Sequence, residues 1–176
     1  MPKLSIKLVN SSLEESDFDC DNPQINTLIK GSFFNCVNQI AYTYEMCIDD
    51  TPLGYYMIQL KSINSGIPEE ISDYWDASLE MSVPCLYIHL IAIDKKYQKQ
   101  GYGKLLMKHI ISTVFNMIEY VPIRMILLKA VADKVTWYEQ LGFTKLTSSE
   151  GFEEYMYIDC LTSEHRADLK TFEEEE

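Results

Sequence analysis

Three features that would assign a protein to a class at once are absent from this chain of 176 residues. No run of about eighteen apolar residues occurs, and no basic start is followed by an apolar stretch, so we predict neither a membrane span nor a signal peptide. The five cysteines are odd in number and scattered, without a C-x-x-C pair or a cysteine–histidine cluster. We therefore expect no metal site, and we expect reduced thiols in a cytoplasmic protein.

Basic side chains are scarce as well, since 15 Lys and Arg stand against 27 Asp and Glu, for a net charge of −12. Such a surface repels nucleic acid and anionic membranes on average, so we expect neither as a partner. Residues 95–118 are an exception, because they hold five lysines and no acidic residue. We interpret this window as an anion-binding region, and a solvated helix face is the alternative. The five are Lys95, Lys96, Lys99, Lys104 and Lys108.

The chain has enough apolar material for one hydrophobic core, with 47% hydrophobic and 12% aromatic residues. Its length suits a single domain. Residues 1–160 are predicted to form that domain. Residues 161–176, which end in four glutamates, are predicted to be an acidic tail.

Hydrophobic periodicity predicts the elements of the first half of the chain. Alternation predicts a strand at 4–8. Asp21-Asn22-Pro23 has the composition of a helix start, and the helical spacing that follows is interrupted at Gly31. The β-rich runs 41–48 and 53–60 predict a hairpin.

The second half alternates strands and helices after a polar stretch at 62–84, where we expect a long loop in which Tyr74 and Trp75 pack on the core or line a substrate entrance. The right-handed crossover between its first two strands predicts one parallel pair in a mixed sheet. The expected elements are a strand at 86–93, a helix from Tyr102 that ends before Pro122, a strand at 124–131, a short helix from an Asp133 N-cap to Leu141 closed by Gly142, and strands at 143–146 and 154–158.

Residues 98–104 join the strand at 86–93 to the following helix. Successive backbone N–H groups at a helix start form a concavity that suits a phosphate, and the two glycines of this junction let the backbone approach it. Lysines are unfavourable at a helix N-terminus, so Lys99 and Lys104 make sense if an anion lies between them. A tight turn that needs two glycines is the alternative. Neither the Walker pattern nor the dinucleotide fingerprint fits the spacing.

The spacing Q-x-x-G-x-G is supplied by Gln98, Gly101 and Gly103, and residues 137–143 read W-Y-E-Q-L-G-F. In this order and separation the two blocks resemble the GNAT family of N-acetyltransferases. The pyrophosphate motif of that family is R/Q-x-x-G-x-G/A, and its later signature is F/W-Y-x-x-x-G-F. The resemblance covers residues 53–158.

This resemblance implies an α/β (α+β) fold with a mixed, largely antiparallel central sheet, one splayed parallel strand pair, and helices on both faces. Residues 1–160 would then be an N-acetyltransferase domain. Acetyl-CoA is the implied co-substrate, and the implied acceptor is a primary amine of a small molecule or a basic peptide. Family members are often dimers, so a homodimer is a further expectation.

The resemblance also implies roles for individual residues. Pantetheine would hydrogen-bond along the strand near Ile91 and Ile93, and the N–H near Ile91 would polarise the thioester carbonyl. Tyr138 would protonate the departing thiolate as a general acid, and a core aromatic residue on a short helix is the alternative. The pyrophosphate would be held by the amides of Gln98, Lys99, Gln100, Gly101, Tyr102, Gly103 and Lys104.

The sequence leaves the general base open. His89 and Glu80 are candidates, although a lone histidine in a buried strand is more often a hydrogen-bonded core residue, and some relatives use a chain of waters. Many family members carry Asn and Ala where this chain has Val131 and Lys134. A protein that binds coenzyme A without catalysis, for regulation or assembly, therefore stays an alternative.

Residues 18–28, together with Gly54-Tyr55-Tyr56, are similar to the acetyltransferase toxins of type II toxin–antitoxin systems, which acetylate the amino group of aminoacyl-tRNA. A capped helix start would look much the same in other folds. Those toxins commonly carry Arg where this chain has Leu90. Outside residues 95–118 the net charge is −17, because that window contributes +5 to a total of −12, and this disfavours contacts to tRNA phosphates. We keep the toxin as an alternative.

Overall fold

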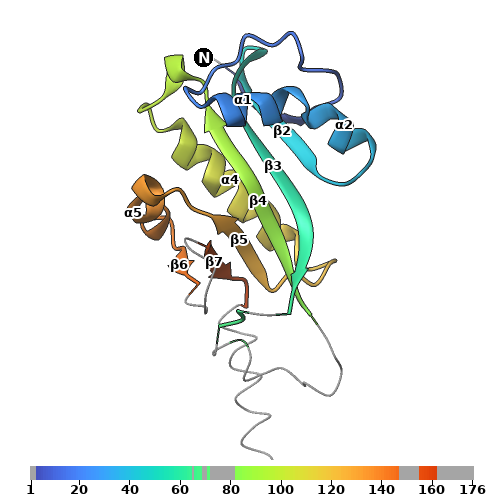
Figure 1. Cartoon of the computed structure of the whole chain (residues 1–176), viewed down its shortest axis with the longest axis vertical. Coiled ribbons are helices and arrows are strands. Elements are labelled where there is room, and N and C mark those ends of the chain that lie inside the picture. The colour runs from blue at the N-terminus through green and yellow to red at the C-terminus, as the bar shows by residue number, and fades with distance from the viewer. Residues whose placement is uncertain (1–2, 65, 69–70, 72–81, 147–154, 162–176) are drawn as a thin grey trace, which may run out of the picture.

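The computed structural model describes residues 3–64, 66–68, 71, 82–146 and 155–161, and within them the central feature is a seven-stranded sheet (Figure 1). Its strand order is β1-β2-β3-β4-β5-β7-β6. The strands are β1 (Leu4–Leu8), β2 (Tyr42–Ile48), β3 (Thr51–Ile63), β4 (Val83–Ile93), β5 (Met125–Lys129), β6 (Thr144–Lys145) and β7 (Tyr155–Asp159). Only β4 and β5 pair in parallel among these strands. The predicted mixed sheet with one parallel pair is confirmed.

Helices cover both faces of the sheet, as predicted (Figure 1). Residues of α1 and α2 share a buried cluster with one face, and residues of α4 share another cluster with the opposite face. The helices are α1 (Pro23–Lys30), α2 (Ser32–Val37), α4 (Tyr102–Met117) and α5 (Val135–Glu139), with 3-10 turns η2 (Lys95–Tyr97) and η3 (Ala132–Lys134).

One face of α4 packs against the sheet. Met107 is fully buried, whereas Leu105 is 43% exposed. Each large apolar side chain that α4 buries contributes about 1.5–3 kcal/mol to folding. The fully or nearly fully buried set is Leu106, Met107, Ile110 and Val114.

A β-bulge divides β4 into two halves. Met57 pairs with Leu90 and Ile58 pairs with Ile88, so His89 is an extra residue without an opposite partner on β3. An extra residue reverses the alternation of side chains beyond it. Leu86 and Ile88 accordingly pack with α4, whereas Leu90 and Ala92 pack with α1 and α2. The bulge therefore turns Ile91 and Ile93 to the α4 side.

The parallel pair is splayed, as the resemblance implied. β5 pairs with β4 only from Cys85 to Ile88, and among the residues that the structure describes no strand pairs with that side of β4 from there to Ile93. The backbone edge of β4 after the bulge is thus available for a ligand.

Several boundaries differ from the predicted ones. The hairpin turn consists of Asp49 and Asp50 alone, both with positive φ, which matches the twist of a two-residue hairpin. β3 extends to Ile63 and β4 begins at Val83, so the predicted loop at 62–84 is shorter. Tyr74, Trp75 and the tail beyond Leu161 lie outside the described residues.

Both expected features of the first helical region are confirmed. Asn22 is the N-cap of α1 and accepts from the backbone N–H groups of Gln24 and Ile25, at 3.1 and 3.2 Å. Gly31 separates α1 from α2.

The prediction for the last helix is partly wrong. Asp133 is not an N-cap: it lies in η3, and its carboxylate pairs with the adjacent Lys134. α5 begins only at Val135 and ends at Glu139, short of the expected Leu141. Gly142 follows at φ +94°, a conformation that glycine adopts without strain.

Candidate active site

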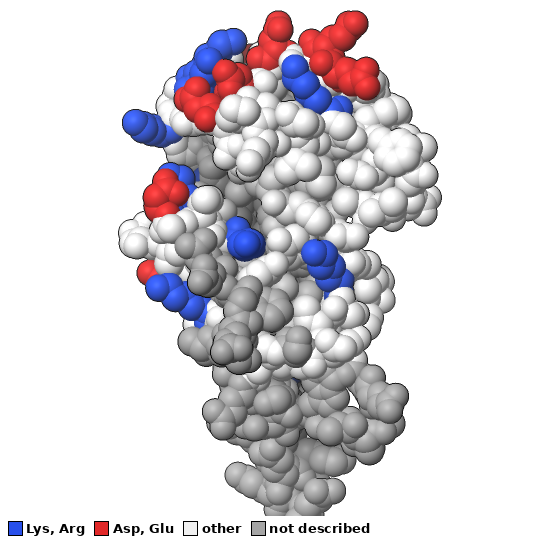
Figure 2. Space-filling view, in the orientation of Figure 1, with Lys and Arg blue, Asp and Glu red and all other residues white. Residues whose placement is uncertain are grey.

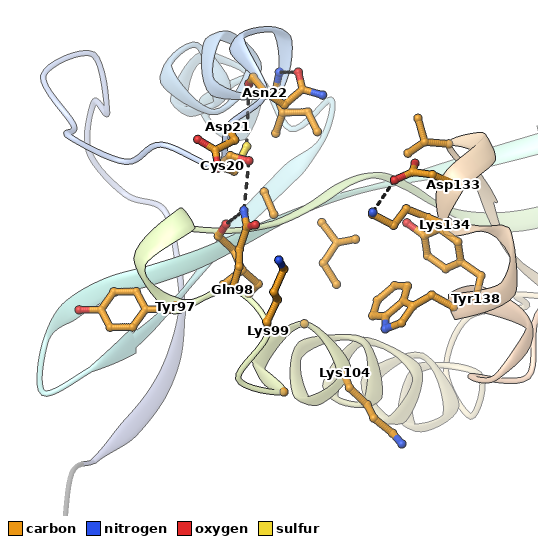
Figure 3. A pocket seen from close by; sticks show the side chains of 18 residues that line it. Cys20, Asp21, Asn22, Tyr97, Gln98, Lys99, Lys104, Asp133, Lys134 and Tyr138 are labelled. Atoms are coloured by element: carbon orange, nitrogen blue, oxygen red, sulfur yellow. Dashed lines mark hydrogen bonds and ion pairs between the residues drawn. The ribbon is translucent and has the colours of Figure 1, made fainter.

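A cavity of about 880 Å³ lies at the open edge of β4 (Figure 3). One wall comes from residues between Cys20 and Ile25, which lead into α1. The second runs from Ile91 to Lys104 through the end of β4 and the start of α4. The third comes from residues between Val131 and Tyr138, around α5. The cavity therefore has the predicted phosphate loop and the predicted catalytic tyrosine on different walls.

The start of α4 exposes backbone amides to this cavity. Lys99 and Gly101 have φ values of +60° and +90°, and this left-handed backbone turns the chain sharply into the helix. The first helical hydrogen bond runs from the N–H of Leu105 to the carbonyl of Gly101. In the described part of the chain no protein group accepts a hydrogen bond from the backbone N–H groups of Gly101, Tyr102, Gly103 and Lys104. Such a set of amides suits an anion.

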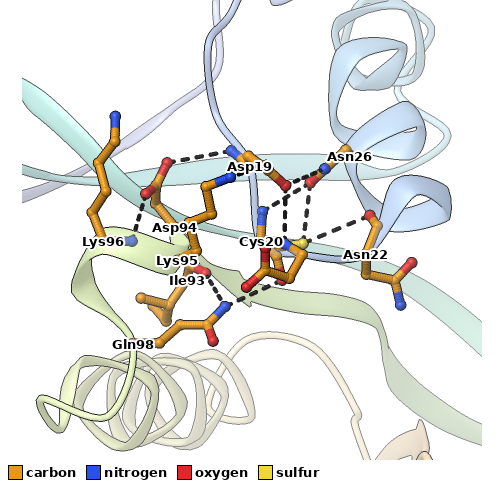
Figure 4. A network of polar contacts seen from close by, with 10 residues as sticks. Asp19, Cys20, Asn22, Asn26, Ile93, Asp94, Lys95, Lys96 and Gln98 are labelled. Atoms are coloured by element: carbon orange, nitrogen blue, oxygen red, sulfur yellow. Dashed lines mark hydrogen bonds and ion pairs between the residues drawn. The ribbon is translucent and has the colours of Figure 1, made fainter.

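The Gln98 side chain lines the cavity and is hydrogen-bonded to two backbone carbonyls. Its Nε2 donates to the carbonyls of Cys20 at 3.1 Å and Ile93 at 3.0 Å. The amide side chain therefore joins the segment before α1 to the end of β4 (Figure 4).

A buried carboxylate strengthens the same connection. Asp94 is 5% exposed and accepts from the N–H groups of Lys96 at 2.9 Å and Asp19 at 3.3 Å. The N–H of Lys95 donates to the Asp19 carbonyl at 2.8 Å, and the Lys95 ammonium pairs with the Asp19 carboxylate at 2.6 Å (Figure 4). The Lys95 ammonium, and then hydrogen bonds from the Asn26 side chain and the Asp21 N–H, lower the pKa of Asp19 to about 2. The wall before α1 is thus fixed to the phosphate loop.

The lysine-rich window contributes to the site only in part. Lys99 extends into the middle of the cavity, whereas the amine of Lys104 points away along α4 (Figure 3). Lys95 is paired with Asp19, and Lys96 and Lys108 do not line the cavity. The anion-binding interpretation therefore stays a prediction, and it now concerns the loop rather than the whole window.

Two of the predicted coenzyme-binding residues do not line the cavity. Gln100 donates from its Nε2 to the Lys96 carbonyl at 3.1 Å. Tyr102 packs edge-on against Tyr97, with ring centroids 6.4 Å apart. Any contact from these two would come from the backbone. The other predicted residues line the cavity: Ile91, Ile93, Gln98, Lys99, Gly101, Gly103, Lys104 and Tyr138.

Tyr138 combines burial with access to the cavity. It is 8% exposed and packs edge-on against Trp137 and Phe143, at centroid distances of 4.9 and 5.7 Å. Burial raises its pKa to about 12, because the phenolate would be poorly solvated. The hydroxyl therefore stays protonated at neutral pH, as a proton donor must.

His89 is exposed, contrary to the expectation of a buried strand residue, because it is the extra residue of the bulge. Its Nε2 lies 2.8 Å from the Gln59 Oε1. Partial desolvation and then the charge of Lys61 lower its pKa, so the imidazole is neutral at pH 7. His89 does not line the cavity, and Glu80 lies outside the described residues.

Comparison with known proteins decides the family. The model of the acetyltransferase (GNAT) domain matches residues 43–145. The chain belongs to the GNAT acetyltransferase family. The family and fold predicted from the sequence are thereby confirmed.

Individual relatives of this GNAT chain carry toxin names. A probable toxin TacT from Sinorhizobium fredii (strain NBRC 101917 / NGR234) is 28% identical over 116 residues, which cover 60% of this chain and 63% of the relative. The match thus spans less than two thirds of that relative.

Solved toxin structures share the GNAT fold at low identity. A Tyr-to-Phe mutant of KacT has a TM-score of 0.75 at 21% identity, covering 96% of this chain and 98% of that one. AtaT complexed with acetyl-methionyl-tRNAfMet has a TM-score of 0.73 at 21% identity, covering 97% and 99%. A Tyr-to-Phe mutant of AtaT bound to the C-terminus of the antitoxin AtaR and acetyl-CoA has a TM-score of 0.70 at 21% identity, covering 90% and 94%.

Two other features are absent from the described ranges. No helix there is long and apolar enough to span a membrane. No group of three or more His, Cys, Asp or Glu there could hold a metal ion.

The sequence missed one whole wall of this GNAT site. Asp21 and Asn22 were interpreted as a helix start, and Cys20 only as part of the toxin-like segment 18–28, yet all three line the cavity. No local pattern could have placed them there, because the contacts of this segment with Asp94 and Gln98 span more than seventy residues of sequence.

Proposed function

We propose that this protein transfers the acetyl group of acetyl-CoA to a primary amine. The proposal depends on one observation: a single cavity joins the unpaired amides at the start of α4 to the Tyr138 hydroxyl along the free edge of β4. The amides suit the pyrophosphate, the strand edge suits the amide groups of pantetheine, and the tyrosine suits the thioester end.

The proposed reaction is a direct transfer. The free amine attacks the thioester carbonyl, whose developing oxyanion is stabilised by a backbone N–H of β4 near Ile91. The C–S bond then breaks, and Tyr138 donates its proton to the coenzyme A thiolate. The nitrogen loses a proton to a water or to a neutral base, for which His89 is a candidate.

The distribution of charge along the chain bears on the choice of acceptor. The described residues hold thirteen basic and thirteen acidic side chains, so their net charge is zero. The remaining residues hold fourteen acidic and two basic side chains and account for the −12. The acidity that disfavoured nucleic acid therefore does not belong to the described body.

The sheet face beside the bulge is locally basic. The Nζ of Lys61, on β3, lies 3.8 Å above the centroid of the Tyr87 ring. On β4, the Tyr87 ring in turn packs against His89. Lys129 is exposed on β5, two residues after Leu127, which packs with Tyr87. Figure 2 views this face and shows separate basic side chains over the middle of the sheet. Such a face suits a phosphate-bearing acceptor.

We therefore propose the amino group of an aminoacyl-tRNA as the acceptor. The basic face supports this choice, as do the names of the similar proteins, one of which is complexed with acetyl-methionyl-tRNAfMet. The second candidate is the primary amine of a small molecule or a basic peptide, which the open cavity also admits.

Assays of several acceptors with the purified full chain test both the acetyl transfer and the identity of the acceptor. We expect radiolabelled acetyl groups from acetyl-CoA to appear on aminoacyl-tRNA and not on the deacylated tRNA control. Transfer only to polyamines, amino acids or basic peptides would overturn the acceptor but retain the acetyltransferase. Binding of coenzyme A without transfer to any acceptor would favour the regulatory module.

A cellular role as a toxin is a further part of the proposal, and it rests on the relatives' names. Induction of the intact gene should then arrest growth, and the Tyr138→Phe variant at equal expression should not. A cytoplasmic location and a homodimer are proposed with it, and residues 1–160 are proposed as the acetyltransferase domain.

A further inference from the structure

A third lysine enters the cavity from the wall opposite the phosphate loop. Lys134 belongs to η3, and its ammonium reaches into the cavity from the side of α5, facing Lys99 on the loop (Figure 3). Its interaction within the described residues is an ion pair with the neighbouring Asp133, at 2.5 Å.

The fold does not account for this lysine. Its side chain is 54% exposed and that of Asp133 is 70% exposed, and an exposed ion pair contributes about 0–1 kcal/mol. Lys134 occupies the N-cap position of α5 without forming a capping hydrogen bond, and a cation there opposes the helix dipole. The Lys134 ammonium is therefore available to a ligand in the cavity.

The ligand of the proposed function has two separate anionic groups. Acetyl-CoA carries a diphosphate in its chain and a 3′-phosphate on its ribose. The amides from Gly101 to Lys104 and the ammonium of Lys99 already offer enough donors for the diphosphate. Of the three lysines in the described part of the chain that line the cavity, Lys104 points away, which leaves Lys134 for the second group (Figure 3).

We propose that Lys134 binds the 3′-phosphate of coenzyme A, and that Asp133 holds the Lys134 ammonium in place until the ligand arrives. This inference rests on the proposed function, because it takes acetyl-CoA as the ligand. The carboxylate of Asp133 is exposed and can return to solvent when the phosphate replaces it.

Calorimetry with two ligands tests the inference. Acetyl-CoA and acetyl-dephospho-CoA, which lacks the 3′-phosphate, are titrated into the wild type, Lys134→Met and Lys108→Met. The Lys108 control is an exposed lysine of α4 that does not line the cavity. We expect the wild type to bind the dephospho ligand about tenfold more weakly, Lys134→Met to lose about tenfold for acetyl-CoA only, and Lys108→Met to match the wild type.

Asp133→Asn is the second variant. It frees Lys134 from its partner, so we expect acetyl-CoA to bind about two- to threefold more tightly while the dephospho ligand is unaffected. Thermal unfolding checks that all variants are folded.

Each other outcome is decisive. A wild type that binds both ligands equally, or a Lys134→Met variant that weakens both equally, overturns the assignment of the 3′-phosphate and leaves the acetyltransferase standing. A wild type that binds neither ligand overturns the proposed function itself.

Discussion

At the scale of single residues, Tyr138 and His89 show how position decides protonation. Tyr138 is buried beside two aromatic rings, which favours the neutral phenol. His89 is exposed by a bulge, but partial desolvation and Lys61 favour the neutral imidazole. One group is therefore ready to donate a proton at pH 7, and the other is ready to accept one.

Replacement of Tyr138 by Phe removes the proposed proton donor without changing the packing of the ring. We expect kcat to fall by about 100-fold or more, since general acid catalysis commonly contributes a factor of 10² to 10⁴. The dissociation constant of acetyl-CoA should change less than twofold, because the proposed role of the hydroxyl is proton transfer in the reaction step. Single-turnover kinetics and calorimetry separate the two effects, and an unchanged kcat would assign Tyr138 to packing.

The raised pKa of Tyr138 predicts the alkaline side of the pH profile. A general acid acts while it is protonated, and this phenol keeps its proton up to a pKa of about 12, whereas an ordinary tyrosine loses it near 10. We expect the rate of acetyl transfer at saturating substrates to show no decline between pH 8 and about 10.5. A decline centred near pH 10, corrected for thioester hydrolysis, would contradict the assigned environment.

At the scale of elements, the close approach of β3 and β4 shapes the cavity wall. A Cβ atom on Gly54 would lie 2.6 Å from the Ile93 Cδ1 and 2.8 Å from the Ala92 carbonyl oxygen. β4 therefore packs too close to position 54 for any side chain larger than that of glycine. Because Ile93 also lines the cavity, a change at Gly54 would reach the cavity wall.

Gly54→Ala should accordingly affect both folding and binding. We expect the free energy of unfolding to fall by about 1–3 kcal/mol, as is usual for overpacking, and the affinity for acetyl-CoA to fall with the displacement of Ile93. Gly31→Ala is the matched control, because its φ is −82° and the nearest atom to a new Cβ is 3.8 Å away. Urea unfolding and calorimetry measure the two effects, and equal stability of both variants would refute the clash.

The sequence predicted most elements because their signals are local. Asn22 and Pro23 determine where α1 begins, and Gly101 and Gly103 mark the start of α4. It failed at Asp133, which has the composition of an N-cap but lies in η3 and pairs with the adjacent Lys134, so α5 begins only at Val135.

The candidate site, like the helices and strands, was predictable only where its residues are contiguous in the sequence. The phosphate loop and the tyrosine block are contiguous motifs, so they were found. The bulge at His89 and the wall at Cys20 depend on the pairing of β3 with β4 and on contacts such as that of Gln98, which no window of sequence contains.

At the scale of the whole molecule, charge is divided between the described body and the remaining sequence. The body has equal numbers of basic and acidic side chains, and it exposes Lys61 and Lys129 on the face beside the bulge. The total of −12 is therefore a poor guide to what this face binds.

Neutralising this face should weaken the proposed nucleic acid acceptor alone. We expect the double variant Lys61→Met/Lys129→Met to raise the KM for aminoacyl-tRNA by about tenfold or more at low salt, since each lost phosphate contact weakens binding. The KM for acetyl-CoA should not change. Lys108→Met, on the helix that covers the opposite face, is the control. An unchanged KM for the tRNA in steady-state assays would remove this face from the acceptor site.

The bulge in β4 has a consequence for how such chains can diverge. Because His89 is unpaired, the count of residues in β4 differs by one from that of its neighbour. Loss of that single residue would exchange the inward and outward sets from Leu90 to Ile93. A related chain that carries this deletion and keeps an intact hydrophobic core would no longer present Ile91 and Ile93 to the cavity. A one-residue deletion in β4 therefore indicates altered activity more clearly than many substitutions do.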